Sequence, residues 1–175
     1  MHFDKILALD PSGSFYEGKG TTGWCLFDAN LMTCIETGSI FAKDYVSMEA
    51  YWDAVLQLVI TYTTPATILV CEDYLLYATK TTEQINSRME TPKLIGVLQH
   101  ACWTAHIPYY MQTAGEVKNR WTNEILAYKG YIVKRGRSWA PATGACTTYT
   151  HHSLDAIRHA VHYATFRNKE KSVYV

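Results

Sequence analysis

Three acidic residues occur at positions where sheet proteins usually place ligand-binding groups. Asp10 closes an apolar run at residues 5–9, and Glu72 closes a second run at residues 67–71. Short apolar runs bounded by turn residues predict buried strands, so each acid should lie at the rim of a sheet. Asp155 follows in a segment whose spacing predicts a helix. Three carboxylates from distant parts of the chain are therefore expected to meet.

These carboxylates suit hard divalent cations. Hydrolysis of a phosphodiester near neutral pH needs an activated water and stabilisation of charge on the leaving oxygen, which two Mg²⁺ or Mn²⁺ ions about 3.5–4 Å apart supply. We interpret Asp10, Glu72 and Asp155 as metal ligands and catalytic residues; a surface or helix-capping role is the alternative for each acid alone. Asp73 should point to the opposite face of its strand. Zinc would need soft ligands, and no cysteine has matching local spacing.

Histidines share a helical stripe with the third acid. His152, Asp155, His159 and His162 follow one another at spacings of three, four and three, which places them on one side of a helix. Only the first turn needs to approach the strand ends, so we include His152 with Asp155 in the site. The alternative for His152 is that it only fills the first turn. We expect His159 and His162 on a polar face opposite the apolar one.

Composition indicates one globular domain spanning residues 1–175. The chain has 175 residues, of which 48% are hydrophobic and 18% charged, and these values exclude a disordered chain and a membrane protein. No run approaches the ~20 apolar residues that a bilayer crossing needs. The N-terminus enters a strand instead of a signal peptide, so we expect a cytoplasmic protein with no membrane partner. The five cysteines contain no C-x-x-C pair, which favours free thiols.

Basic residues are unevenly distributed although the net charge is zero. Zero net charge counts against nucleic-acid binding, because phosphate contacts need Lys and Arg. Between residues 118 and 137, however, basic residues far outnumber the single acid, Glu124. A solvated surface is the alternative for this patch. The expected nucleic-acid-binding residues are Lys118, Arg120, Lys134, Arg135 and Arg137, and the aromatic residues that could stack on bases are Tyr74, Tyr77, Trp139 and Tyr149.

The hydrophobic pattern predicts a mixed order of strands and helices. The first three strands should form an antiparallel meander, and the unbroken apolar run at 67–71 should be an interior strand. Ser47 and Thr91 are the expected N-caps of two helices, and Gly130 is the expected end of another. Segments 75–90 and 131–145 show no clear period. The expected strands are 5–10, 23–27, 33–41, 67–71 and 108–112, and the expected helices are about 47–64, 91–105, 114–129 and 150–166.

Five short segments, taken together, resemble one family of nucleases. They are Leu9-Asp-Pro-Ser12, Val70-Cys-Glu72, Glu90-Thr-Pro-Lys-Leu-Ile-Gly96, Gly115-Glu-Val-Lys118 and His152-Ser-Leu-Asp-Ala156. In order and spacing they resemble the RuvC-like Holliday-junction resolvases, especially the phage branch, within the RNase H-like nucleases. The resemblance implies an α/β, RNase H-like fold with a five-stranded mixed sheet flanked by helices. The link at residues 14–19 is longer than is usual in that family.

The resemblance also implies a function. It implies an endonuclease that uses two Mg²⁺ or Mn²⁺ ions, works as a homodimer and resolves four-way junctions and other branched DNA by paired nicks, in a bacterial or infected host cell. His152 matches a family position that holds His or Asp beside the metal, and Lys118 matches a catalytic lysine; an ordinary exposed lysine is the alternative. A helix face with Gly96 and Trp103 would form the dimer contact. The alternative functions are an RNase H-like nuclease acting on RNA or flap DNA and a non-catalytic junction-binding protein.

Overall fold

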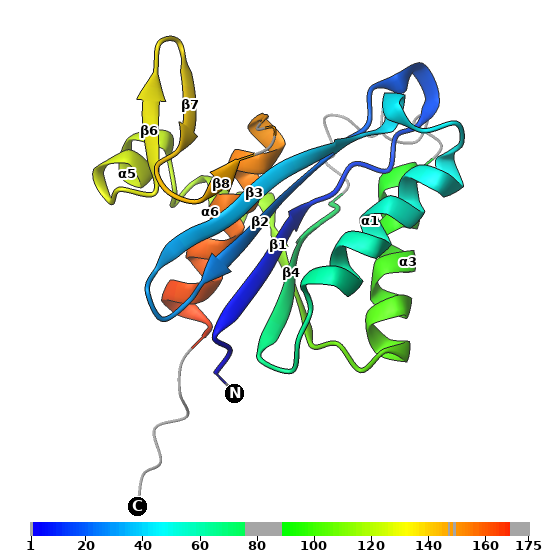
Figure 1. Cartoon of the computed structure of the whole chain (residues 1–175), viewed down its shortest axis with the longest axis horizontal. Coiled ribbons are helices and arrows are strands. Elements are labelled where there is room, and N and C mark those ends of the chain that lie inside the picture. Colours follow the sequence, from blue (N-terminus) through cyan, green and yellow to red (C-terminus); the bar gives the residue numbers. More distant parts are fainter. Residues whose placement is uncertain (1, 76–88, 147, 149, 169–175) are drawn as a thin grey trace, which may run out of the picture.

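A mixed sheet of six strands forms the middle layer of the protein (Figure 1). The computed structural model describes residues 2–75, 89–146, 148 and 150–168. The strand order is β5-β4-β1-β2-β3-β8, in which β1 to β3 form an antiparallel meander and β4 and β5 run parallel to β1. The predicted five-stranded sheet, its meander and the interior position of β4 are confirmed, and β8 adds a short sixth strand beside β3. The bounds are β1 Lys5–Asp10, β2 Thr21–Asp28, β3 Thr33–Phe41, β4 Thr67–Asp73, β5 Tyr109–Thr113 and β8 Ala145–Cys146.

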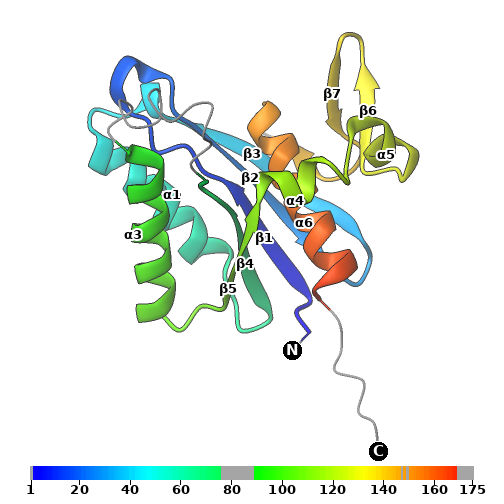
Figure 2. The same cartoon turned by 180° about the vertical axis from the view of Figure 1, so that it is seen from behind.

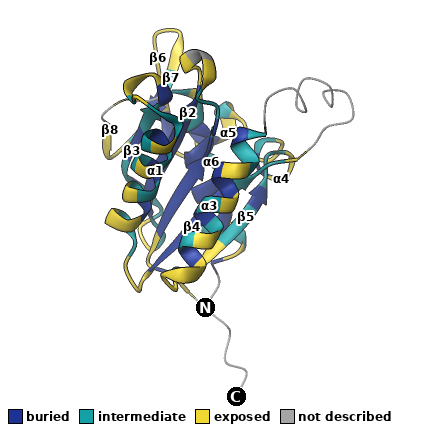
Figure 3. Ribbon diagram, turned by 90° about the vertical axis from the view of Figure 1, so that its right-hand side faces the viewer, coloured by how far each residue is buried: buried dark blue, intermediate teal, exposed yellow. Residues whose placement is uncertain are grey.

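Helices cover both faces of this sheet (Figures 1 and 2). Helices α1 and α3 pack on one face and α6 packs on the other, and the strands β1, β2 and β4 are mostly buried between them (Figure 3). Within the described ranges, every helix is too short or too polar to traverse a bilayer. The helices are α1 Met48–Tyr62, α3 Glu90–Thr104, α4 Ala114–Lys118, α5 Asn123–Tyr128 and α6 His151–Phe166, with 3-10 turns η1 Tyr16–Gly18 and η2 Ala42–Asp44.

The alternation of side chains along β1 and β4 decides where their acids point. On β1, Ile6 and Ala8 pack against α6, whereas residues 7 and 9 belong to the core beneath α1 and α3. On β4, residues 68 and 70 likewise face α6. Asp10 and Glu72 continue these two rows, each one residue beyond the last paired position of the parallel β1–β4 register. Both acids therefore lie at one edge of the sheet, on the α6 side.

The sequence predicted the N-cap of α1 correctly and that of α3 incorrectly. Ser47 caps α1 as predicted, since its hydroxyl accepts a hydrogen bond from the backbone N–H three residues on at 3.1 Å. The cap predicted at Thr91 is wrong, because α3 begins at Glu90 after Met89 in the left-handed conformation (φ 55°). The Thr91 hydroxyl instead accepts a hydrogen bond from the Gly13 backbone N–H at 3.1 Å. It thereby ties the loop after β1 to α3.

The segment after β5 forms shorter elements than predicted. The single helix expected over 114–129 is split into α4 and α5, because Thr122 caps a new helix with its hydroxyl. Gly130 (φ 79°) follows the last turn of α5, as predicted. Next, β6 Ile132–Arg135 and β7 Ser138–Pro141 pair as a hairpin that extends away from the sheet (Figure 1), with Gly136 (φ 61°) in its two-residue turn. The sequence shows no period here because the buried side chains are few: Ile132, Ala140 and Pro141.

All five cysteines are free thiols, as predicted. Cys25 on β2 and Cys34 on β3 are buried neighbours, and the Cys25 thiol donates a hydrogen bond to the Cys34 sulfur at 3.7 Å without a disulfide. Most of the predicted 75–90 loop, residues 76–88, lies outside the described residues.

Candidate metal centre

Three carboxylates converge at the edge of the sheet. Asp10, Glu72 and Asp155 each offer an oxygen, and these oxygens all lie within 4.8 Å of one another. Asp10 and Asp155 are buried and Glu72 is half-buried, so the cluster lies at the margin of the core. The neighbouring Asp73 is outside the cluster, and its Oδ1 accepts a hydrogen bond from the backbone N–H of Tyr74. The acids singled out in the sequence thus meet as predicted.

A glycine on β2 lets α6 reach these strand ends. Gly23 pairs in register with Asp10 across β1 and β2. A Cβ atom built on Gly23 would lie only 2.1 Å from the carbonyl carbon of His152, in the first turn of α6. Thr150 and Ser153 form a capping box that begins this helix, and the Thr150 hydroxyl also bonds that of Ser39 on β3 at 2.9 Å. Close backbone approach and a fixed N-terminus therefore hold α6 against the sheet.

His152 contacts the first carboxylate. Its Nδ1 lies 2.7 Å from Oδ2 of Asp10, and its ring is tilted by 38° against that of His151, with centroids 4.0 Å apart. Burial raises the pKa of Asp10 despite this hydrogen bond. Burial alone would lower the pKa of His152, but the bond to Asp10 raises it overall.

Lys118 lies between the other two carboxylates. Its Nζ is 2.9 Å from Oδ2 of Asp155 and 3.2 Å from Oε2 of Glu72. Burial would lower the pKa of Lys118, but the hydrogen bond to Asp155 and the charge of Glu72 raise it overall. Burial would raise the pKa of Glu72, but hydrogen bonds from His159 and Lys118 lower it overall. A single positive charge therefore partly balances the negative charges of Glu72 and Asp155.

Two further residues of α6, Arg158 and His159, contact the carboxylates, and sequence reasoning missed both. The predicted polar face for His159 and His162 is wrong, because their exposed fractions are 0% and 4%. His159 instead bonds Glu72, with Nε2 2.9 Å from Oε2. Arg158 bonds Asp155 and also reaches the break between α4 and α5, where its Nε donates to the carbonyl oxygen of Trp121 at 2.9 Å. The spacing of four residues between Asp155 and His159 indicated that both lie on one side of the helix. It could not reveal that His159 bonds Glu72, which is 87 residues away in the chain.

Comparison with known proteins identifies the fold. No family model matches the chain, and no curated protein matches it by sequence. Among solved structures, the RuvC protein of T. thermophilus in complex with a Holliday junction substrate is similar, with a TM-score of 0.63, 15% sequence identity and 93% of each chain covered. The fold is RNase H-like. The predicted fold class is confirmed, and at this identity the likeness extends to fold alone.

The other predicted basic residues lie away from the carboxylates of this RNase H-like domain. Lys134, Arg135 and Arg137 are exposed on the β6–β7 hairpin, which we name the basic hairpin. The Lys134 ammonium lies 5.9 Å from the ring centroid of Trp139 on β7. Arg120 is exposed after α4 and packs its guanidinium 4.0 Å from the ring centroid of Phe166.

A hollow lies between the hairpin and α6, near the carboxylate cluster. A cavity of ≈ 330 Å³ lies between the base of the hairpin and the start of α6, and Trp139, His151 and Arg158 are among its lining residues. Arg158 is also the partner of Asp155, so hairpin and carboxylates are neighbours through one side chain. Of the remaining predicted stacking residues, Tyr74 lines a smaller cavity beside Glu72, whereas Tyr77 and Tyr149 lie outside the described residues.

Proposed function

We propose that this protein is a divalent-metal-dependent endonuclease that resolves four-way DNA junctions by paired nicks. The observation that carries the proposal is the convergence of Asp10, Glu72 and Asp155 within 4.8 Å at the edge of an RNase H-like sheet. The similar RuvC structure was solved with a Holliday junction substrate, which supports branched DNA as the substrate class. The phage-branch assignment rests on the sequence segments alone.

The donor set fits hard cations. Carboxylate oxygens are the ligands that Mg²⁺ and Mn²⁺ prefer, and two such ions would supply an activated water and stabilise charge on the leaving oxygen. Asp10, Glu72, His152 and Asp155 would hold them. Lys118, whose ammonium is already at the carboxylates, would bind the scissile phosphate or stabilise negative charge in the transition state.

The basic side chains would position the DNA. Lys134, Arg135 and Arg137 on the basic hairpin, together with Arg120, would contact phosphates, and Trp139 would stack on an exposed base. Contacts of this kind fix the orientation of DNA without selecting a sequence. With such a substrate, the protein would act in the cytoplasm of a bacterial or infected host cell.

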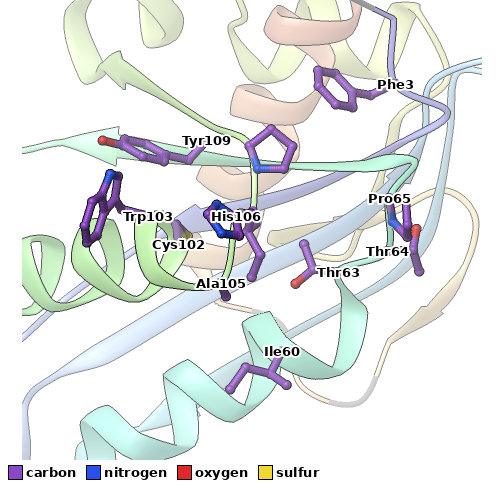
Figure 4. A pocket seen from close by; sticks show the side chains of 12 residues that line it. Phe3, Ile60, Thr63, Thr64, Pro65, Cys102, Trp103, Ala105, His106 and Tyr109 are labelled. Atoms are coloured by element: carbon purple, nitrogen blue, oxygen red, sulfur yellow. The ribbon is translucent and has the colours of Figure 1, made fainter.

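A second copy of the chain would pack against α3. Trp103 on this helix is 71% exposed, and a cavity of ≈ 880 Å³ beside it is lined by Tyr109 of β5 and Ile60 of α1 (Figure 4). Gly96 on the same helix has open space around its α-carbon, which permits close approach of a partner. A two-fold dimer would present two metal centres to two opposed strands. Light scattering at micromolar concentration tests this; a monomer that still cuts junctions in pairs contradicts it.

Cleavage assays with matched variants test the catalytic proposal. Wild type should cut labelled four-way junctions in preference to flap DNA and RNA–DNA hybrids. Asp10→Asn, Glu72→Gln and Asp155→Asn should each abolish cleavage while junction binding and folding persist, because the metal loses a charged ligand but side-chain volume is kept. Asp73→Asn is the control, since this adjacent acid lies outside the cluster. Near-wild-type turnover in any one of the three would remove that residue from the site.

The alternative functions give different results. A nuclease for RNA or flap DNA would cut all three substrates equally or favour the other two. A non-catalytic junction-binding protein would bind junctions but show no thermal shift with Mg²⁺ or Mn²⁺. The convergence of three carboxylates favours the enzyme over the binding protein.

His152 should set the metal preference. Mn²⁺ accepts an imidazole more readily than Mg²⁺ does, so the wild type should tolerate or prefer Mn²⁺. His152→Asp should keep activity and shift the preference toward Mg²⁺, and His152→Ala should lose rate with either ion. An identical Mg²⁺ to Mn²⁺ rate ratio in all three proteins would show that His152 only fills the first turn of α6.

A further inference from the structure

A buried chain of hydrogen bonds runs behind Glu72. Glu72 and Gln112 are direct partners in the parallel pairing of β4 and β5. His159 lies across both from α6, with Nε2 2.9 Å from Oε2 of Glu72 and Nδ1 2.9 Å from Oε1 of Gln112. His159 has an exposed fraction of 0% and Gln112 of 1%. This arrangement belongs to the core, yet it ends on a carboxylate of the metal centre.

The direction of the hydrogen bond to Glu72 is fixed by chemistry. An ionised carboxylate only accepts hydrogen bonds, so Nε2 of His159 must carry a proton and donate it. On the other side, Nε2 of Gln112 has no partner among the described residues. Rotating this amide by half a turn exchanges its oxygen and nitrogen, and its N–H then donates to Nδ1 of a neutral imidazole. In either orientation of the Gln112 amide, the Nε2–H of His159 still donates its hydrogen bond to Glu72.

Glu72 needs such a support more than the other two acids do. Its side chain is longer than that of aspartate and only half-buried. Lys118 also bonds Oε2, at 3.2 Å, but its own side chain is 38% exposed. Asp155, by contrast, is held by Arg158, and Asp10 is buried beside His152. Of the two described side chains that bond Glu72, Lys118 is partly exposed and His159 is fully buried.

We propose that His159, backed by Gln112, is a positioning residue that fixes the Glu72 carboxylate for metal binding. Holding Oε2 from behind fixes the side-chain rotamer, so Glu72 is oriented toward Asp10 and Asp155 before any ion arrives. Groups that orient a metal ligand in this way typically account for about 10–100-fold in metal affinity. This inference rests on the proposed function, because it assumes that the carboxylates hold a metal.

The test measures metal affinity without DNA. Mg²⁺ and Mn²⁺ are titrated separately into wild type, His159→Phe and His159→Gln by calorimetry, and unfolding is followed in EDTA. The phenylalanine variant keeps ring bulk but donates no hydrogen bond, so its Kd should rise about 10–100-fold. The glutamine variant can donate to Glu72 and should recover most of the affinity. His162→Phe is the matched control, since this buried histidine one turn along α6 contacts Glu116 instead.

A second measurement separates positioning from general stability. In a Glu72→Gln background, His159→Phe should cause no further loss of affinity, because its effect passes through the lost carboxylate. Should His159→Phe fail to fold, His159→Asn, whose amide is too short to reach Glu72, replaces it. Unchanged Kd values in folded variants, or equal losses in His162→Phe, would overturn the proposal. A wild type that binds no metal would instead refute the proposed function itself.

Discussion

Gly23→Ala should damage the candidate metal centre, although Gly23 contributes no side chain to it. The added Cβ would lie 2.1 Å from the carbonyl carbon of His152. Because ordinary carbon–carbon contacts lie at about 3.5–4.0 Å, the first turn of α6 must retreat by about 1.5 Å. This turn carries His152 and Asp155, so two of the groups in the site move away from Glu72.

The expected losses follow from that displacement. Misplacement of catalytic groups by about 1 Å costs on the order of 100-fold in rate. Overpacking at a backbone contact should lower the free energy of unfolding by about 1–3 kcal/mol. Junction binding should change little, because the basic hairpin is not displaced by the added methyl group. Single-turnover cleavage, a junction-binding titration and thermal unfolding measure the three quantities.

Gly115→Ala is the matched control. A Cβ at this exposed position of α4 meets nothing within 4 Å, although Lys118 is only three residues away. This variant should cut junctions at the wild-type rate. If Gly23→Ala also cleaved like wild type and unfolded at the same temperature, the close approach of α6 to β2 would not control the site.

Three further results are expected. Lys118→Ala should lower the single-turnover rate far more than affinity, because its charge acts mainly in the transition state; a loss of affinity alone would reassign Lys118 to DNA positioning. Replacing Lys134, Arg135 and Arg137 of the basic hairpin with alanine should weaken binding to every DNA and reduce the slope of log affinity against log salt by about one unit per lost phosphate contact. An unchanged slope would show that these residues do not contact phosphates. Burial lowers the pKa of His162 from its ordinary value of 6.5; the charge of Glu116 acts to raise it, and the charge of Arg167 lowers it further. The unfolded chain therefore protonates His162 more readily than the folded protein does, so the free energy of unfolding should fall as the pH drops below about 6.5. His162→Phe should lose less stability over the same pH range. Equal acid sensitivity of wild type and His162→Phe in thermal unfolding would contradict this.

Local rules sufficed for the strands that carry the acids. The apolar runs before Asp10 and Glu72 predict both strands, and a period of two places both carboxylates on one face. The serine cap of α1 was also predictable, since its bond spans only three residues. These features depend on neighbours in the chain, which the sequence displays directly.

Features that depend on distant partners were not predictable. His159 looked like a member of a polar face because Glu72 and Gln112, which satisfy its ring nitrogens, lie on other elements. Thr91 has the residue type of an N-cap, but tertiary contact with Gly13 uses its hydroxyl. The hairpin escaped notice because most of its side chains are exposed and leave no alternation to detect.

The length of the basic hairpin bears on how much of a DNA arm the protein covers. Its strands are four residues long, which at about 3.4 Å per residue gives a ribbon of about 14 Å. The major groove of DNA is about 12 Å wide and admits a two-stranded ribbon. Under the proposed function, the hairpin can enter a groove of the arm beside the cut, so chemical footprinting should show protection that extends beyond the cleaved phosphate on one side. Shortening the ribbon at its turn would then shrink the footprint while leaving the carboxylates untouched.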